Sequence, residues 1–554
     1  MNAIVAEPFG IEAGKKDRDL KYVQKLSECL LVELADELNK FHDTQYSIRY
    51  WQILLGNWLQ RFIAVAFNRY FTIAKALENY KVSGTTVFES VGYSLATTNS
   101  MSFIRACSDD VWNHNFYAKV LGFFGDTKVE IDSVPLPKMS GFAQTMDEKI
   151  VPKASLKRLI GNVARFVLPS LSRKNDAFII NSYLPLKEEI ILQLSLGQCP
   201  QVWRSPKLKT ISPATDIRQS FGVDAEKHQG FERFVRIMLA EVIPTCYLEG
   251  YNQLIEQVES LPWPVSPRFI LTSNNFDTDE IFKAWTSSKV DMGVPYYVGQ
   301  HGGSYGTYLG CPDMPELLTC DRFLTWGWSE YLNTVPAFNF KISSLKPAGY
   351  DADGGLLLIE LHEPDPVLVW DVYYEFGVYQ QEQFRFVEAL PESIQQQLKI
   401  RLHPACSKFR WSDEQRWKEH SPHVRIESGA ATIRALTAQS RLVVHSYDST
   451  GILETLALNI PTICFWHGGL GHLLPTAKPY YESLRSAGII ADTAEQAAEM
   501  VGLHWDDISG WWNSQPVQDA RKAFCDKYSR KEKHPVRTMR RLLTSHAKNR
   551  GKLP

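Results

Sequence analysis

Three acidic side chains follow a predicted buried strand, where they could take part in chemistry. The run 269–272 is apolar, as expected of a strand, and Asp277, Asp279 and Glu280 come after it, where a helix is predicted to begin. Carboxylates at the carboxyl end of a parallel strand face the ligand crevice of an α/β sheet. There they could serve as nucleophile or as general acid and base in sugar transfer. The simpler interpretation is that they cap the following helix.

A histidine follows the next predicted strand, 294–299, in a glycine-rich turn that begins Gln300-His301-Gly302. Parallel strands end at the same edge of a sheet, so His301 would face the same crevice as the acidic turn. A turn histidine alone indicates little. Paired with a carboxylate at that edge, it favours a reaction at a sugar.

The predicted strand 398–403 ends in a second polar pair. Arg401 and His403 lie two positions apart, so both side chains emerge on one face of the strand, which Pro404 would end. An arginine suits phosphate or carboxylate through its bidentate fork, and a histidine can donate to a phosphate oxygen. The pair therefore fits an anionic ligand.

After the predicted strand 441–445 comes the start of a short helix. Ser446, Ser449 and Thr450 are good N-cap residues. Free N–H groups and the helix dipole favour an anion at such a helix start, and Glu454, about one turn in, could accept hydrogen bonds from ribose hydroxyls. The alternative is an ordinary strand–helix–strand unit of an α/β protein.

The run 449–462 reads Ser-Thr-Gly-x-Leu-Glu-x-Leu-Ala-x-Asn-x-Pro-Thr and resembles the nucleotide-sugar loop and helix of GT-B glycosyltransferases. More narrowly, the chain resembles a family of bacterial surface-carbohydrate transferases related to the retaining β-Kdo transferases. Blocks spread over much of the chain carry the resemblance in the same order. They are the Arg-Tyr-Trp segment within 47–59, then 273–283, 300–306, 449–466 and 477–526.

This resemblance implies that Asp279 attacks the anomeric carbon of the donor sugar, with Asp277 as the alternative nucleophile. It also implies that His301, Arg401 and His403 assist with the nucleotide and the sugar acid. The candidate catalytic residues are Asp279, His301, Asp277 and Glu280, and the candidate nucleotide-sugar-binding residues are Arg401, His403, Ser446, Ser449, Thr450, Glu454, Gln300 and Gly302.

Apolar strands alternate with helices over most of the chain, which predicts the α/β class. The resemblance implies a GT-B-like fold: two Rossmann-like domains facing a central cleft, with a helical N-terminal segment and C-terminal helices. We expect an acceptor-side domain at 1–340 that carries the nucleophile, a nucleotide-sugar-binding domain at 341–516 and a basic helical tail at 517–554. Proline and glycine residues predict the linker, at 336, 347, 349, 354 and 355.

Composition indicates where the protein works. Nine cysteines without a Cys-x-x-Cys pair argue against a disulfide framework or a structural zinc site and favour a reducing cytoplasm. Residues 521–554 carry 12 Lys or Arg against Asp526 and Glu532, and the remaining chain has 48 basic and 60 acidic residues. The tail therefore suggests peripheral contact with the anionic inner-membrane surface, or else a solvated basic helix. Nucleic acid is not expected, since no aromatic-interleaved basic stripe is present.

The resemblance implies transfer of a CMP-activated ulosonic acid, Kdo or a relative, to a glycan or lipid-linked glycan acceptor. Double displacement would retain the anomeric configuration. No metal or other cofactor is expected, because the Asp-x-Asp pair at Asp351 and Asp353 lies in the linker. The alternatives are an inverting or UDP/GDP-sugar transferase on the same fold, a teichoic-acid-like polyol-phosphate transferase, and an inactive scaffold.

Overall fold

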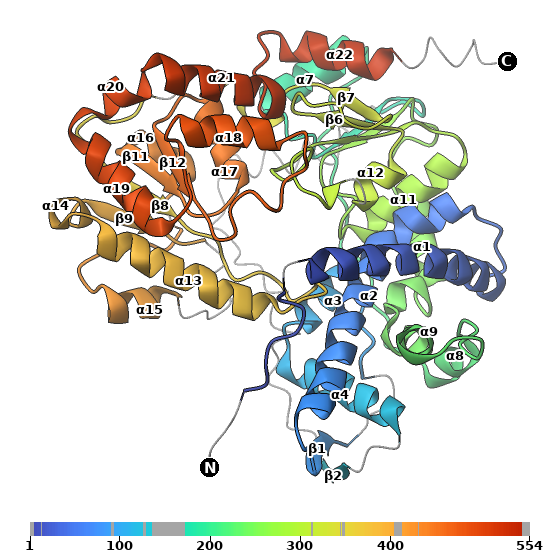
Figure 1. Ribbon diagram of the computed structural model, residues 1–554. Helices are drawn as coiled ribbons and strands as arrows, with labels where there is room; N and C mark the ends of the chain where they lie inside the picture. Colours follow the sequence, from blue (N-terminus) through green and yellow to red (C-terminus); the bar gives the residue numbers. More distant parts are fainter. Residues whose placement is uncertain are drawn as a thin grey trace, which may run out of the picture.

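A computed structural model shows two parallel β-sheets with helices packed on them, and a separate pair of strands (Figure 1). This confirms the predicted α/β class. The structure describes residues 5–12, 14–89, 94–125, 129–135, 172–311, 314–343, 345, 349–403, 413–429 and 431–545. Pro404 and residues 546–554 of the basic tail lie outside these ranges.

The C-terminal sheet has six parallel strands in the order β10-β9-β8-β11-β12-β13. Numbered along the chain, this is the 3-2-1-4-5-6 order of a doubly wound Rossmann sheet, whose ligand crevice lies where the order reverses, between β8 and β11. The strands are β8 (Gly355–Ile359), β9 (Leu398–Arg401), β10 (Arg425–Glu427), β11 (Ser440–His445), β12 (Thr462–Phe465) and β13 (Ile490–Ala491).

Alternate residues of these strands enter two different cores, as the two-residue period of a strand requires. Leu356 and Leu358 join a core with the helices on one face, whereas Leu357 and Ile359 join the core that also contains the N-terminal sheet. The helices of this part are α13 (Val372–Ala389), α14 (Glu392–Gln395), α15 (Asp413–His420), α16 (Ile433–Ala438), α17 (Thr450–Ala457), α18 (Lys478–Ser486), α19 (Ala494–His504), α20 (Ile508–Trp512) and α21 (Gln515–Tyr528).

The N-terminal sheet has five parallel strands in sequential order, β3 (Phe178–Ile180), β4 (Ile270–Thr272), β5 (Tyr296–Gly299), β6 (Arg322–Thr325) and β7 (Thr334–Pro336). The linker expected from position 336 is wrong at its start, because Pro336 is the last residue of β7. A proline without an N–H is tolerated on such an edge strand. The strand pair apart from both sheets is β1 (Gly84–Phe88) and β2 (Glu130–Val134).

Two long helices precede this sheet, α1 (Lys15–Phe41) and α2 (Ile48–Asn79). Apolar residues that recur at helical spacing along α1 are buried from Val23 to Leu38. Ser47 caps α2 by accepting a hydrogen bond from the Tyr50 N–H. The other helices of this part are α3 (Ser100–Ala106), α4 (Asp110–Phe124), α7 (Leu186–Ser195), α8 (Thr215–Ser220), α9 (Gly230–Val242), α10 (Tyr251–Glu259), α11 (Glu280–Asp291) and α12 (Pro315–Thr319).

The two sheets are joined by backbone contacts and by the end of the chain. Segments 307–309 and 472–474 pair antiparallel, with the Leu474 N–H 2.7 Å from the Thr307 carbonyl oxygen. After α21 the chain returns to the N-terminal sheet, where α22 (Pro535–Thr544) packs on α7 (Figure 1). No helix within the described ranges combines the length and apolar character needed to cross a bilayer.

A buried ion pair ties α11 to α3 and to the segment before α10. Lys283 Nζ lies 2.9 Å from a Glu280 carboxylate oxygen, and both side chains are almost fully buried. Lys283 also donates to the hydroxyls of Ser100 and Tyr247, and Glu280 accepts from the Ser100 N–H and the Tyr247 hydroxyl. All these partners are needed, since an unpaired charge in this position would be strongly unfavourable.

We predict that Lys283→Met lowers the free energy of unfolding by about 3–5 kcal/mol, because it leaves the Glu280 carboxylate buried without its counter-ion. The double variant Glu280→Gln/Lys283→Met should recover most of the loss, since the amide keeps hydrogen bonds and carries no charge. Urea unfolding followed by tryptophan fluorescence measures both. A double variant as unstable as the single one would contradict this assignment.

Candidate active site between the two sheets

A cavity of about 770 Å³ lies beside the carboxyl ends of β4 and β5, and Asp277 is one of its lining residues. Arg61 of α2 forms an ion pair with Asp277 at 2.7 Å, and Asn57, one turn earlier, donates a hydrogen bond to the same carboxylate. Burial would raise the pKa of Asp277, but the Arg61 guanidinium, with smaller effects of Lys283 and Asn57, outweighs burial and holds the pKa below its usual value. The cavity therefore contains an ionised carboxylate at neutral pH.

His301 lines the same cavity. Its Nδ1 lies 3.2 Å from the Tyr305 hydroxyl, which donates to the buried Glu316 carboxylate. Burial, and then the nearby Lys341 ammonium, lower the pKa of His301 to about 4, against the opposing effect of Asp277. The ring is therefore neutral at physiological pH, and with Nδ1 occupied, Nε2 remains to accept a proton in the cavity.

Asp279 is placed differently from Asp277. Its carboxylate caps α11 by accepting from the Phe282 N–H, and it also accepts hydrogen bonds from Asn275 and Ser205. Burial raises the pKa of Asp279, opposed by these hydrogen bonds. Asp279 does not line the cavity, and neither does Glu280, which is in the buried ion pair with Lys283. Of the three acidic candidates, the structure brings Asp277 to the histidine.

The glycine-rich turn after β5 contacts the start of α17. The Gly303 N–H donates to Thr450 Oγ1 at 2.8 Å, and a Cβ at Gly302 would lie 3.0 Å from the same oxygen. Gln300 is fully buried below this turn, where its amide donates to the Gly302 carbonyl and accepts from Trp328 Nε1. Gln300 thus supports the turn, while the glycines allow the close approach between the two sheets.

The crevice between β8 and β11 is filled by protein groups. Ser446 is fully buried and its Oγ lies 2.8 Å from the Tyr379 hydroxyl. Ser449 is also buried, with its Oγ 3.4 Å from a ring nitrogen of His445. Beside them, burial raises the pKa of Glu360 to about 8, opposed by hydrogen bonds from Trp417. A ligand reaching the start of α17 would have to move the Gly302–Gly303 turn away.

Glu454 faces the N-terminal sheet across the gap. Its carboxylate lies 3.6 Å from Lys341 Nζ, and burial raises the pKa of Glu454 against the effect of that ammonium. Lys341 Nζ is also 5.1 Å from the centre of the Tyr183 ring, which in turn lies 6.1 Å from the His301 ring. This chain of contacts connects the predicted ribose-binding residue to the cavity histidine.

Arg401 and His403 lie at the end of β9, on the far side of the crevice. Arg401 is buried and donates to the Leu402 carbonyl, whereas His403 is partly exposed, with its ring 4.3 Å from that of His362. Burial raises the pKa of Asp365, whereas His362 and Arg61 lower it. Asp365 therefore lies within electrostatic range of both.

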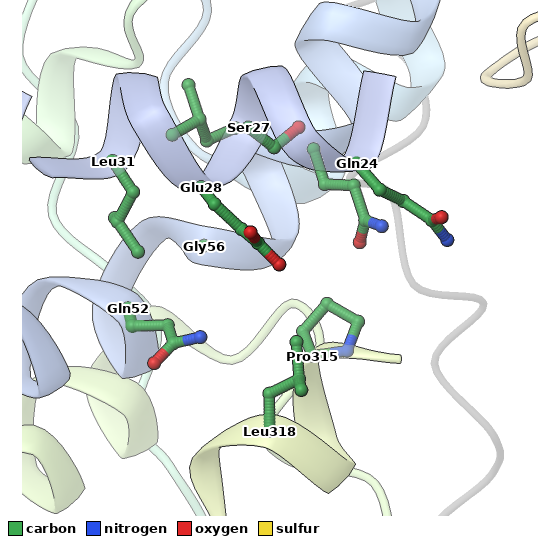
Figure 2. Close-up of a pocket in the computed structure, with 10 residues that line it drawn as sticks. Gln24, Ser27, Glu28, Leu31, Gln52, Gly56, Pro315 and Leu318 are labelled. Carbon is green, nitrogen blue, oxygen red and sulfur yellow. The ribbon is translucent and has the colours of Figure 1, made fainter. Parts of the chain in front are cut away.

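A smaller cavity adjoins the large one between α1, α2 and α12 (Figure 2). Gln24, Gln60 and Pro315 line both cavities. In Figure 2 the polar side chains of Glu28 and Gln52 point toward the space above α12. Amide and carboxylate groups over an apolar floor provide hydrogen bonds and contact area of the kind that a saccharide uses.

The sequence analysis missed several residues that complete the site: Asn57, Arg61, Tyr305, Glu316, Lys341 and Asp365. Arg61 had a signal, since it interrupts an otherwise apolar helix. Tyr305 and Glu316 had none, because their contact depends on how the turn after β5 folds onto α12. In the described part of the chain, no group of three or more His, Cys, Asp or Glu side chains is arranged to hold a metal ion.

Comparison with known proteins gives one strong match. The chain matches none of the curated proteins with which it was compared. A structure assigned as a UDP-N-acetylglucosamine 2-epimerase, from Listeria monocytogenes, is 12% identical, with a TM-score of 0.38 over 68% of this chain and 97% of that one, too low to support an argument. A family model described as "LIC12162 family transferase" matches residues 2–543. The chain therefore belongs to the LIC12162 family of transferases.

Proposed function

We propose that this transferase is a glycosyltransferase that moves an ulosonic acid, such as Kdo, from its CMP derivative to a glycan or lipid-linked glycan acceptor. The observation that carries the proposal is that Asp277 and His301 line the same cavity, which adjoins the start of α17. An ionised carboxylate and a neutral imidazole together suit nucleophilic attack followed by proton removal. The family match supports the broader class, group transfer.

In the first step, a carboxylate oxygen of Asp277 attacks the anomeric carbon, and the bond from that carbon to the CMP phosphate oxygen breaks. In the second, the acceptor hydroxyl attacks the same carbon, its proton passes to His301 Nε2, and the bond to Asp277 breaks. Two inversions give net retention. Asp277 takes the nucleophilic role here because Asp279 is held by its capping hydrogen bonds.

Positive charge around the cavity supports an acidic donor. Arg61 lies beside the proposed nucleophile and could bind the sugar carboxylate through its guanidinium fork. On the other side of the gap, Arg401, His403 and the start of α17 would bind the CMP phosphate, and Glu454 the ribose. Because Ser446 and Ser449 are buried, donor entry requires the Gly302–Gly303 turn to separate from Thr450.

We assign the acceptor to the smaller cavity of Figure 2, because Gln24 and Gln60 line both this cavity and the large one. An acceptor glycan lying between α1 and α12 would direct one hydroxyl toward His301. The active site would then receive donor and acceptor from opposite sides.

We predict that Asp277→Asn lowers kcat on the order of 10³-fold or more, because the amide cannot form the glycosyl adduct. Asp279→Asn is the matched control: asparagine caps a helix about as well as aspartate, so transfer should stay near the wild-type rate. Intact-protein mass spectrometry should detect a gain of one sugar unit in wild type and Asp279→Asn. An active Asp277→Asn variant with an inactive Asp279→Asn variant would return the role to Asp279.

The pH dependence should report on His301. The ring must be neutral to accept a proton, so kcat/KM for the acceptor should hold until the pH falls through about 4, where His301 becomes protonated. His301→Asn should lose both activity and this acidic limb. Circular dichroism at each pH separates titration from unfolding. An acidic limb at the ordinary histidine value of 6.5 would argue against the buried, neutral base.

The donor nucleotide can be tested by thermal shift. A ligand at about 100 times its Kd stabilises the folded state by about 2.7 kcal/mol, so a bound nucleotide raises Tm. We expect CMP, as the nucleotide of the proposed donor, to raise Tm more than UMP, UDP or GDP. Glu454→Gln should reduce the CMP shift by weakening the ribose contact. A larger shift with UDP or GDP would favour the hexose-transferase alternative, and phosphorus in the transferred product would favour polyol-phosphate transfer.

A further inference from the structure

Helix α7 exposes large apolar side chains on one face. Leu186 is 60% exposed, Leu194 56% and Ile191 42%, and the helical repeat places Leu194 between the other two, with Ser195 at the edge beside Ile191. The opposite face, with Leu192, is buried in the core. Single exposed leucines are common, but three large exposed apolar side chains on one short helix, with the exposed Lys187 among them, indicate an interaction surface.

Helix α22 lies against α7 and is amphipathic (Figure 1). Met539 and Leu543 are buried, whereas Arg537, Arg540 and Arg541 are all exposed on the other side. Between Lys527 and Thr544 the sequence has one acidic residue, Glu532, whose carboxylate accepts hydrogen bonds from the His534 N–H and the Thr538 hydroxyl. The exposed arginines therefore face solvent as a stripe of positive charge.

Residues of both helices line a groove of about 440 Å³. Ser195 lines it from α7, and the arginines Arg537 and Arg540 line it from α22, together with Lys533 and His534. The groove thus combines several cationic donors with an adjacent apolar face. A phosphate ester attached to hydrocarbon matches both features, because the phosphate pairs with the guanidinium groups and the hydrocarbon covers the leucines.

We propose that this α7–α22 surface, defined by Leu186, Ile191, Leu194, Arg537, Arg540 and Arg541, docks the protein on an anionic phospholipid bilayer. The apolar side chains enter the headgroup boundary, and the arginines and the groove bind lipid phosphates. The several arginines favour a surface of many phosphates, such as a bilayer, over a second protein. The exposed apolar side chains beside the arginines favour a bilayer over nucleic acid. This inference does not depend on the sugar donor or on the catalytic residues.

Flotation of the full-length protein with vesicles tests the proposal, using vesicles that contain phosphatidylglycerol and vesicles of phosphatidylcholine alone. Wild type should bind the anionic vesicles, and high salt should weaken binding. The triple variant Arg537→Glu/Arg540→Glu/Arg541→Glu should bind these vesicles at least about tenfold more weakly than wild type. The double variant Ile191→Ser/Leu194→Ser should also lose binding, which distinguishes bilayer docking from attraction to charge alone.

A matched charge control lies in the C-terminal sheet region. Lys418→Glu/Arg425→Glu/Arg434→Glu changes the same net charge at exposed positions on α15, β10 and α16, so it should leave vesicle binding near wild type. Unchanged Tm and circular dichroism would show that the variants fold. Equal loss in both triple variants would overturn the proposal, as would wild type that binds RNA oligonucleotides but neither kind of vesicle.

Discussion

The burial of α2 is the constraint on which the arrangement of the site depends. Much of this 32-residue helix, from Tyr50 to Tyr70, is inside the protein, yet it carries polar side chains that cannot be buried without partners. Arg61 satisfies its charge with Asp277, from the turn after β4. Arg69 donates to the Pro366 carbonyl, and Asn68 to that of Val369, in the segment after β8. One buried helix therefore fixes loops from both sheets.

This constraint divides the site into a rigid side and an adjustable side. Asp277 is held by α2 and His301 by Tyr305, so their geometry is set before any ligand binds. Gly303 and Thr450 are joined by a single hydrogen bond. Breaking it costs less free energy than breaking the ion pair and hydrogen bond that hold Asp277. Preorganised candidate catalytic groups beside a separable contact would suit the proposed transfer, since the donor must enter while the reacting groups keep their positions.

Periodicity predicted the elements well because it reports burial directly. The apolar runs before Asp277 and after Arg441 became β4 and β11. The order of the strands could not be read in this way, since pairing is a long-range property. The sequence alone also could not show which of Asp277 and Asp279 lies in the cavity. Both suit a helix start, and what separates them is Arg61, more than 200 positions earlier in the chain.

Carboxylates of the protein already pair with the cations around the cavity. The proposed acidic donor must therefore compete with these carboxylates. Lys341 is paired with Glu454, and Arg61 acts on Asp365 as well as on Asp277. Burial already raises the pKa of Glu454 and of Asp365. An anionic ligand entering beside them would raise both values further, because a like charge disfavours the ionised form. Proton uptake by Glu454 would then free Lys341 for the ligand, while Asp277 keeps its ion pair with Arg61 and stays ionised for the proposed attack.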